Sequence, residues 1–220
     1  MNAWFSTFLR IAIAGALAAV LGACGSLPPA RERPAEFAAS ADSSTMLAKI
    51  VAASTPPEEH SGFRLMPLGV YSLDARLQLA QRAQRSLVVQ YYQLENDPVG
   101  RLLLRTLREA AMRGVKVRVL VDDLYTVKSQ QLLLALSETP NVDVRLFNPF
   151  CCGRNGFLSR FAASPWEIPR LNHRMHNKLF IADGVMAVVG GRNIAEEYFV
   201  LNEAQNFIDM DALVVGKVVP

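Results

Sequence analysis

The sequence predicts an α/β domain built on a largely parallel or mixed sheet, and two observations predict it. Along the chain, segments of two kinds alternate. One kind has apolar residues at helical spacing, and the other is short and has apolar residues at every second position or at every position. The 220 residues are 51% apolar and 20% charged, which allows one domain with a sizeable core and excludes a disordered or collagen-like chain. Alternation of this kind is typical of a sheet covered by helices.

Three helices and three strands are expected in order between residues 72 and 147. Ser72 can cap the first helix, Asp97-Pro98 opens the second, and Gly114 is placed to stop it. The expected helices span residues 72–85, 98–113 and 132–136, and the expected strands span residues 86–92, 115–121 and 142–147. A further short helix is expected near residues 45–53.

Residues 148–172 break this alternation with several prolines and glycines, as a functional or mobile loop does. The segment mixes large apolar side chains with arginines, which suits contact with an anionic lipid surface; packing of the apolar side chains on the domain is equally open. These residues are Phe150, Phe157, Leu158, Phe161 and Trp166, with Arg154, Arg160 and Arg170. Cys151 and Cys152 stay unassigned, because adjacent cysteines pair only through strained geometry.

The N-terminus is interpreted as a targeting segment. The apolar run Ile11–Leu21 is shorter than the roughly 20 residues that span a bilayer. Leu21-Gly22-Ala23-Cys24 resembles a bacterial lipoprotein processing box, so residues 1–23 are expected to be a signal peptide and Cys24 a lipidation site; an ordinary secretory signal remains open. With Gly25 rather than an aspartate after the cysteine, a lipid anchor on the periplasmic face of the outer membrane is favoured. Residues 24–57 are interpreted as a tether.

The charge balance and the cysteine content limit the classes of partner and of structural site that the sequence predicts. The formal charge of +3 comes from 23 basic and 20 acidic residues, and removal of Arg10 with the signal peptide leaves 3 − 1 = +2. This balance does not indicate a dedicated nucleic-acid binder, which is usually more basic. The three cysteines form neither a disulfide framework nor a zinc pattern.

The segment from His176 to Asn193 carries the predicted chemistry. On a strand, His176 and Lys178 project from one face, because side chains alternate. Asp183-Gly184 predicts a hairpin turn, and Gly190-Gly191 leads to Asn193 at the expected start of a short helix. The segment therefore combines an imidazole, an ammonium group, an amide and the start of a helix. This combination indicates a phosphate site.

The spacing H-x-K-x4-D-x6-G-G-x-N resembles the signature of the phospholipase D superfamily. From about His60 to Pro220 the chain is similar to the N-terminal half of bacterial cardiolipin synthases of the C type. The stretches that carry this likeness are Leu87–Tyr92, Arg113–Arg118, Asp122-Asp123, Arg145–Pro149 and Arg174–Lys178. The resemblance implies an α/β/α sandwich with a mixed sheet, in which two similar lobes each supply one motif. Residues 58–220 would be one such lobe.

The resemblance also implies roles for the residues. His176 would be the nucleophile or its general-acid partner, Lys178 and Asn193 would bind phosphate oxygens, and Asp183 would be largely structural. A later acidic residue would orient the histidine; Asp209 matches that position more closely than Asp211, and both are expected on one face of a strand. The chemistry would pass through a phosphohistidine, with no metal or cofactor.

Three hypotheses follow, since the sequence holds one copy of the motif. The favoured one is the first lobe of a membrane-bound phosphatidyltransferase acting on phosphatidylglycerol, alone or with phosphatidylethanolamine, completed by a C-terminal lobe. The second is a homodimeric phosphodiesterase or nuclease with one motif from each subunit. The third is a non-enzymatic, membrane-tethered lobe that binds anionic lipid or a partner chain.

Overall fold

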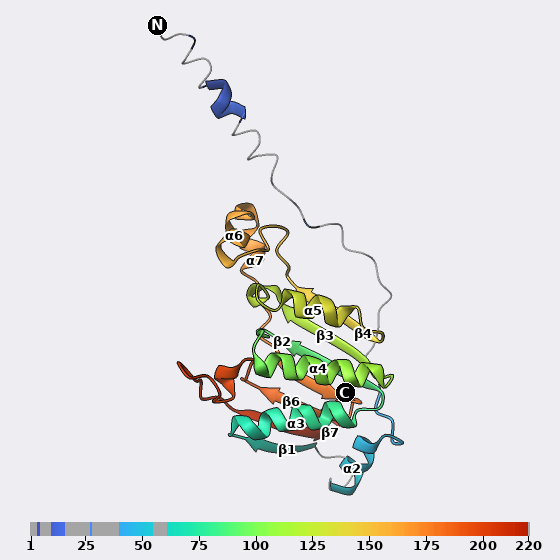
Figure 1. Ribbon diagram of the computed structural model, residues 1–220. Helices are drawn as coiled ribbons and strands as arrows, with labels where there is room; N and C mark the ends of the chain where they lie inside the picture. Colours follow the sequence, from blue (N-terminus) through green and yellow to red (C-terminus); the bar gives the residue numbers. More distant parts are fainter. Residues whose placement is uncertain (1–3, 5–9, 16–26, 28–39, 55–60, 220) are drawn as a thin grey trace. The chain divides into compact units, whose positions relative to one another are not determined.

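The computed structural model describes residues 4, 10–15, 27, 40–54 and 61–219, which divide into two compact units (Figure 1). Residues 150–172 belong to the smaller unit, together with the described residues before 33. The main unit holds the remaining described residues on either side of that insertion. Each unit is described separately below.

A seven-stranded mixed sheet forms the centre of the main unit. Its strands are β1 (Ser61–Met66), β2 (Ser86–Tyr91), β3 (Lys116–Asp122), β4 (Val142–Phe147), β5 (Lys178–Ala182), β6 (Met186–Gly190) and β7 (Asp211–Gly216). They lie in the order β1-β7-β6-β5-β2-β3-β4. β2, β3 and β4 are parallel, whereas β5, β6, β7 and β1 add antiparallel neighbours beside β2.

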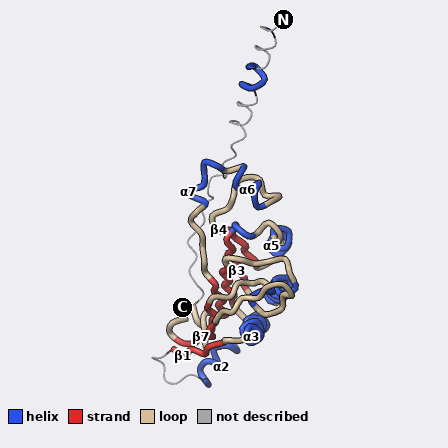
Figure 2. Tube along the Cα trace, turned by 90° about the vertical axis from the view of Figure 1, so that its left-hand side faces the viewer, coloured by secondary structure: helices blue, strands red, loops and turns tan. Residues whose placement is uncertain are grey.

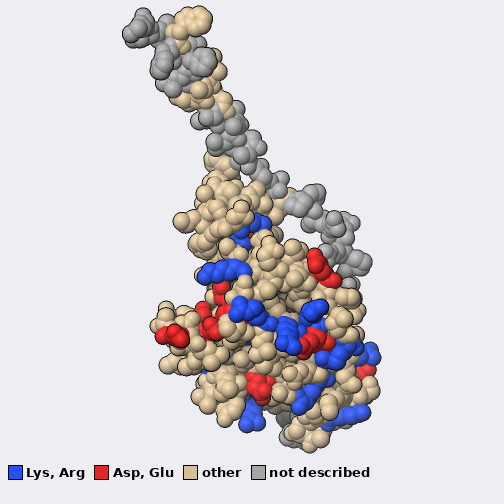
Figure 3. Space-filling view, viewed as in Figure 1, with Lys and Arg blue, Asp and Glu red and all other residues tan. Residues whose placement is uncertain are grey.

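The helices of the main unit are amphipathic. They are α2 (Met46–Ser54), α3 (Gly69–Arg82), α4 (Pro98–Met112) and α5 (Gln130–Ser137). In α4, Asp97 caps the first turn by accepting from the N–H of Gly100, and Pro98 occupies the first helical position. Leu103 and Leu107 point inward while Arg105 is exposed, and basic side chains gather over the face where α4 lies (Figure 3).

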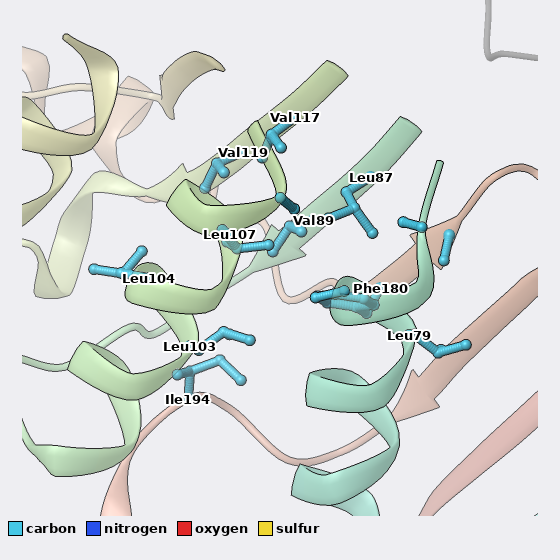
Figure 4. Packing of buried hydrophobic residues seen from close by; sticks show 14 of the residues in the cluster. Leu79, Leu87, Val89, Leu103, Leu104, Leu107, Val117, Val119, Phe180 and Ile194 are labelled. Carbon is cyan, nitrogen blue, oxygen red and sulfur yellow. The ribbon is translucent and has the colours of Figure 1, made fainter. Parts of the chain in front are cut away.

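The main core lies between these helices and one face of the sheet. Val89 of β2 pairs with Val119 of β3 and with Phe180 of β5, so all three side chains share that face. Leu103 and Leu107 of α4 pack onto it (Figure 4). Leu47 of α2, in the segment interpreted as a tether, is also buried in this core.

The opposite face of the sheet carries a smaller apolar cluster. Ala187, Val214 and Val219 are its buried members, and within the described residues no helix contributes to it. The view along the sheet shows α3 and α5 on one side of the strands (Figure 2). The helices of the main unit therefore line a single face.

The α/β class and the mixed sheet are confirmed, and most element positions agree within a few residues. Strand β1 was not expected, and α3 begins at Gly69 rather than Ser72, whose hydroxyl instead bonds to Asp211 inside the core. The hairpin forms as predicted, with positive φ at Asp183 (52°) and Gly184 (67°). β6 follows this turn and begins at Met186.

The smaller unit corrects the expectation of an irregular loop. Residues 150–172 contain α6 (Phe157–Ala162), a 3-10 turn (Pro165–Glu167) and α7 (Ile168–Leu171). Phe150 is buried and its ring meets that of Phe161 at a centroid distance of 5.1 Å. The segment is therefore organised around its own aromatic contacts.

The expected cleavage and lipidation site at Cys24 lies outside the described residues, as does most of the expected signal peptide and tether. Among the residues that are described, no helix is long and apolar enough to cross a membrane.

Candidate active site

His176 lies two residues before β5, at the end of the sheet where β2 and β3 finish. Its side chain is exposed. Its imidazole stacks on the ring of Tyr92, with centroids 4.0 Å apart and planes inclined by 24°. Tyr92 directly follows β2, and Tyr125 meets its ring edge-on at 5.2 Å. The stack fixes one face of the imidazole and leaves the exposed side chain open to a substrate.

The backbone on both sides of His176 is also fixed. The buried carboxylate of Asp122, at the end of β3, accepts from the backbone N–H of Met175 at 2.8 Å and pairs with the Arg174 guanidinium at 2.9 Å. On the other side, the N–H of Tyr92 donates to the carbonyl of Asn177 at 3.1 Å. Asp122 and Tyr92 therefore position the histidine through its neighbours in the chain.

Lys178, the first residue of β5, places its ammonium beside the same group. Its Nζ donates to the backbone carbonyl of His176 at 2.9 Å and lies 5.4 Å from the centroid of the Tyr92 ring. Partial burial lowers the pKa of Lys178, and the negative charge of Asp209 opposes that shift. A cation in this half-buried position acts more strongly on a nearby phosphate than one in bulk water.

Asp209 lies just before β7 and packs against the double glycine. A Cβ on Gly191 would stand 1.9 Å from a carboxylate oxygen of Asp209, so any larger residue there would displace the Asp209 side chain. Asp209 accepts from the N–H of Met210 at 2.7 Å. Within the part of the chain that the structure describes, no hydrogen bond joins Asp209 to His176; the carboxylate acts on Lys178 through its charge.

Asp211 is separated from this group. It opens β7 rather than sharing a strand with Asp209, which corrects the expectation that both lie on one strand face. Its buried carboxylate pairs with Arg76 at 3.1 Å, accepts from the hydroxyl of Ser72, and lies 3.6 Å from Arg192. Arg76 also donates to the hydroxyl of Tyr91 at 2.6 Å. This network links α3 to the sheet.

Asn193 is not at a helix start. The nearest helical turn covers Glu196–Tyr198, and Asn193 is buried in the extended segment before it. Its amide oxygen accepts from the N–H of Gln93 at 3.2 Å, and its amide nitrogen donates to the hydroxyl of Tyr198 at 2.9 Å. Asn193 therefore joins the end of β2 to the segment after β6.

Asp183 lies at the opposite end of β5 from Lys178. At roughly 3.3 Å per residue, this five-residue strand separates the two by roughly 16 Å. The buried Asp183 carboxylate accepts from the backbone N–H groups of Gln84, Arg85 and Ser86 at 2.8–3.2 Å. The structure therefore brings His176, Lys178 and Asp209 into one region and leaves Asp183 outside it.

Sequence reasoning did not assign a site role to Tyr92 and left Asp122 between a site residue and a turn cap. Tyr92 follows β2 and Asp122 ends β3, so both lie at the carboxyl ends of parallel strands, where ligand sites of α/β folds occur. This placement was the available signal. Among the described residues, no group of three or more His, Cys, Asp or Glu side chains is arranged to hold a metal ion.

Comparison with known sequences identifies a family match and similar proteins for this chain. Residues 77–219 match the family described as "Cardiolipin synthase, PLD-like domain". The chain is 46% identical over 151 residues to cardiolipin synthase C of Escherichia coli strain K12, an overlap of 67% of this chain and 31% of that relative. It is 28% identical over 135 residues to cardiolipin synthase A of Pseudomonas fluorescens, or 61% of this chain and 26% of that relative. The chain spans between about a quarter and a third of the length of these curated relatives.

Solved structures agree on the fold. NucT from Helicobacter pylori superposes with a TM-score of 0.51 at 19% identity, over 71% of this chain and 86% of that one. Phosphatidylserine synthase of Haemophilus influenzae superposes with a TM-score of 0.52 at 14% identity, over 71% of this chain and 34% of that one. At such identities the likeness concerns the fold.

Proposed function

Because the chain belongs to the phospholipase D-like domain family of cardiolipin synthases, we propose that it supplies one half of a phosphatidyltransferase site. The observation that carries the proposal is the exposed His176 imidazole, stacked on Tyr92 and adjacent to the Lys178 ammonium. A held imidazole beside a fixed cation suits attack on a phosphodiester.

The proposed reaction has two displacements. An imidazole nitrogen attacks the phosphorus of phosphatidylglycerol, and the bond from phosphorus to the glycerol headgroup breaks as a second histidine donates a proton to the leaving oxygen. The hydroxyl of a second phosphatidylglycerol then attacks the phosphohistidine and gives its proton to that second histidine. The products are cardiolipin and glycerol, and both histidines return to their starting state. His176 takes either of the two histidine roles.

Lys178 stabilises the negative charge that develops on the phosphoryl oxygens. The Asp209 charge helps keep Lys178 protonated, and its carboxylate is the proposed acceptor for a histidine N–H during the reaction. Asn193 contributes a buried amide whose two polar atoms already have partners, so phosphate binding by Asn193 requires an exchange of one of them. Asp183 maintains the fold of the strand that carries Lys178.

The rim of the site suits a lipid substrate. Phe207, Ile208 and Met210 flank Asp209, and all three side chains are exposed, Ile208 completely. Acyl chains next to a headgroup require such apolar contacts. Phosphatidylethanolamine is the second proposed donor, and a lipid anchor at Cys24 in the cell envelope would keep the site at a membrane.

The second histidine comes from outside the residues of this motif. We propose a C-terminal lobe with a second motif; a second copy of this chain is the alternative, and it would make a homodimeric phosphodiesterase or nuclease. The match to 86% of the NucT chain but about a third of the cardiolipin synthases allows both arrangements.

The test is expression of the gene in bacteria that lack cardiolipin synthases, with cardiolipin measured by mass spectrometry. Cardiolipin formed by the wild type and lost with His176→Ala supports the proposal. His173→Ala is the matched control, since this histidine lies three residues earlier and outside the stack. The 220 residues expressed alone should form no cardiolipin. Absence of cardiolipin when the wild-type chain is expressed together with the proposed second lobe, at normal protein levels, would overturn the proposal. Sedimentation with nuclease and phosphodiesterase assays then tests the homodimer.

A further inference from the structure

We propose that residues 150–172 form a membrane-docking unit whose exposed apolar side chains enter the interfacial region of an anionic phospholipid bilayer. The inference deepens the proposed function, since it names the surface through which a lipid-modifying lobe meets its substrate. The observation behind it is an ordered small unit that leaves large apolar side chains in solvent. Its described face is mainly uncharged around α6 and α7 (Figure 3).

The unit is held together from within. The Arg160 side chain is fully buried, with its guanidinium carbon 5.5 Å from the centroid of the Phe150 ring. Phe161 contacts Phe150 on one side and Phe157 on the other, at centroid distances of 5.1 and 5.4 Å. The Ser159 hydroxyl donates to the carbonyl of Gly153, whose φ of 64° suits glycine. The exposed residues are thus mounted on a defined scaffold.

The apolar residues of the unit divide into two groups. Phe150 and Leu171 are buried, so packing within the protein accounts for them. Leu158 is 82% exposed and Trp166 75%, and Phe157 and Ile168 are also largely in solvent. Four large apolar side chains are thus exposed within twelve residues. On an ordinary protein surface such side chains occur singly and scattered.

We infer that the exposed apolar side chains of this unit contact a bilayer rather than a protein. The segment holds Arg154, Arg160 and Arg170 against the single acidic residue Glu167. Because Arg160 is buried, the charge at the surface of the segment is 2 − 1 = +1. Glu167 pairs with Arg170 at 3.0 Å, so no acidic side chain is left to repel an anionic surface. A tryptophan among aliphatic residues with arginines is the composition of interfacial membrane segments.

The experiment uses Trp166 as its own probe. The sequence has two tryptophans, Trp4 and Trp166, so Trp4→Phe leaves Trp166 as the only one. Cys24→Ser in the same full chain removes the expected lipid attachment. With vesicles of phosphatidylethanolamine and phosphatidylglycerol, Trp166 emission should shift to shorter wavelength and be quenched by lipids brominated on the acyl chains. Vesicles of phosphatidylcholine should give a weaker response, and added salt should reduce the anionic preference.

The matched variants separate this unit from other apolar residues. Leu158→Asn with Ile168→Asn should weaken vesicle partitioning about tenfold or more, because two inserted side chains are lost. Met112→Asn with Leu134→Asn, which alters similarly exposed residues of α4 and α5, should leave it unchanged. Circular dichroism confirms that each variant is folded.

Two outcomes overturn the inference. One is vesicle binding without any change in Trp166 emission, which would place the contact elsewhere in the chain. The other is Trp166 shielding only on addition of a protein partner, which would make the unit a protein-binding surface. The vesicle experiment does not depend on cardiolipin formation, so the two proposals can fail separately. Insertion of Trp166, with no cardiolipin formed when the chain is combined with its proposed second lobe, would refute the proposed function alone. Cardiolipin formation without Trp166 insertion would refute this inference alone.

Discussion

The two ends of β5 carry residues of the same short motif in opposite environments. At one end, His176 is exposed and Lys178 half-buried, and the described contacts of the imidazole ring are stacking contacts. At the other end, the Asp183 carboxylate is buried and accepts from three consecutive backbone N–H groups. One end is available to a substrate, and the other is fully engaged in holding β2 beside β5.

This difference teaches that a motif defined by spacing need not be a set of reacting groups. Asp183 secures the strand whose first residue is Lys178, so it contributes to the site through the fold. Asp209 and Asp211 differ in the same manner: one acts on Lys178, while the other is buried with Arg76. The predictions below separate effects on activity from effects on stability.

Replacement of His176 by alanine should have the largest effect. Cardiolipin formation should fall at least about a thousandfold, because the covalent route is lost. The free energy of unfolding should change by less than about 0.5 kcal/mol, since the side chain is exposed. Urea denaturation checks the second part, and a large loss of stability would break the contrast between the strand ends.

Asp183→Ala should show the reverse pattern. Loss of the carboxylate leaves buried N–H groups without acceptors, which should lower the free energy of unfolding by about 3 kcal/mol. Asp183→Asn, which keeps one acceptor oxygen, should lose less. Urea denaturation of both variants measures this, and full activity in the folded fraction is expected. Unchanged stability with lost activity would instead make Asp183 a reacting group.

Asp122→Asn should affect both quantities moderately. The substitution keeps an acceptor for Met175 but removes the charge that pairs with the buried Arg174. We expect a loss of about 2 kcal/mol in stability and about tenfold in activity, with a changed NMR shift of the His176 imidazole. An unaltered His176 signal would show that Asp122 acts on stability alone.

Asp209→Asn should produce a change in pH dependence. The Asp209 charge raises the pKa of Lys178, which partial burial lowers. Removing that charge lowers the pKa of Lys178 further, so the alkaline decline of activity should move to lower pH. A pH–rate profile of the wild type and variant tests the direction. A shift to higher pH would contradict the placement of Asp209 beside Lys178.

The sequence was sufficient for the class of fold and for the motif, because both depend on local periodicity and spacing. It placed β4 at residues 142–147 and the Asp97 cap correctly. It could not place β1, whose pairing with β7 links distant parts of the chain, or the stacking of Tyr92 on His176. The helices within 150–172 were hidden by prolines and glycines, which occur there at helix starts and in turns.

The position of β1 has a consequence for biosynthesis. β1 pairs only with β7 within the described sheet, with Ser61 opposite Gly216 and Met66 opposite Asp211. During translation β1 emerges before the other strands of the described sheet, and it stays unpaired until β7 has been made. Phe63 and Leu65, which remain exposed even in the finished sheet, are then part of an unpaired strand. The nascent chain therefore offers a chaperone a binding segment until β7 has been made.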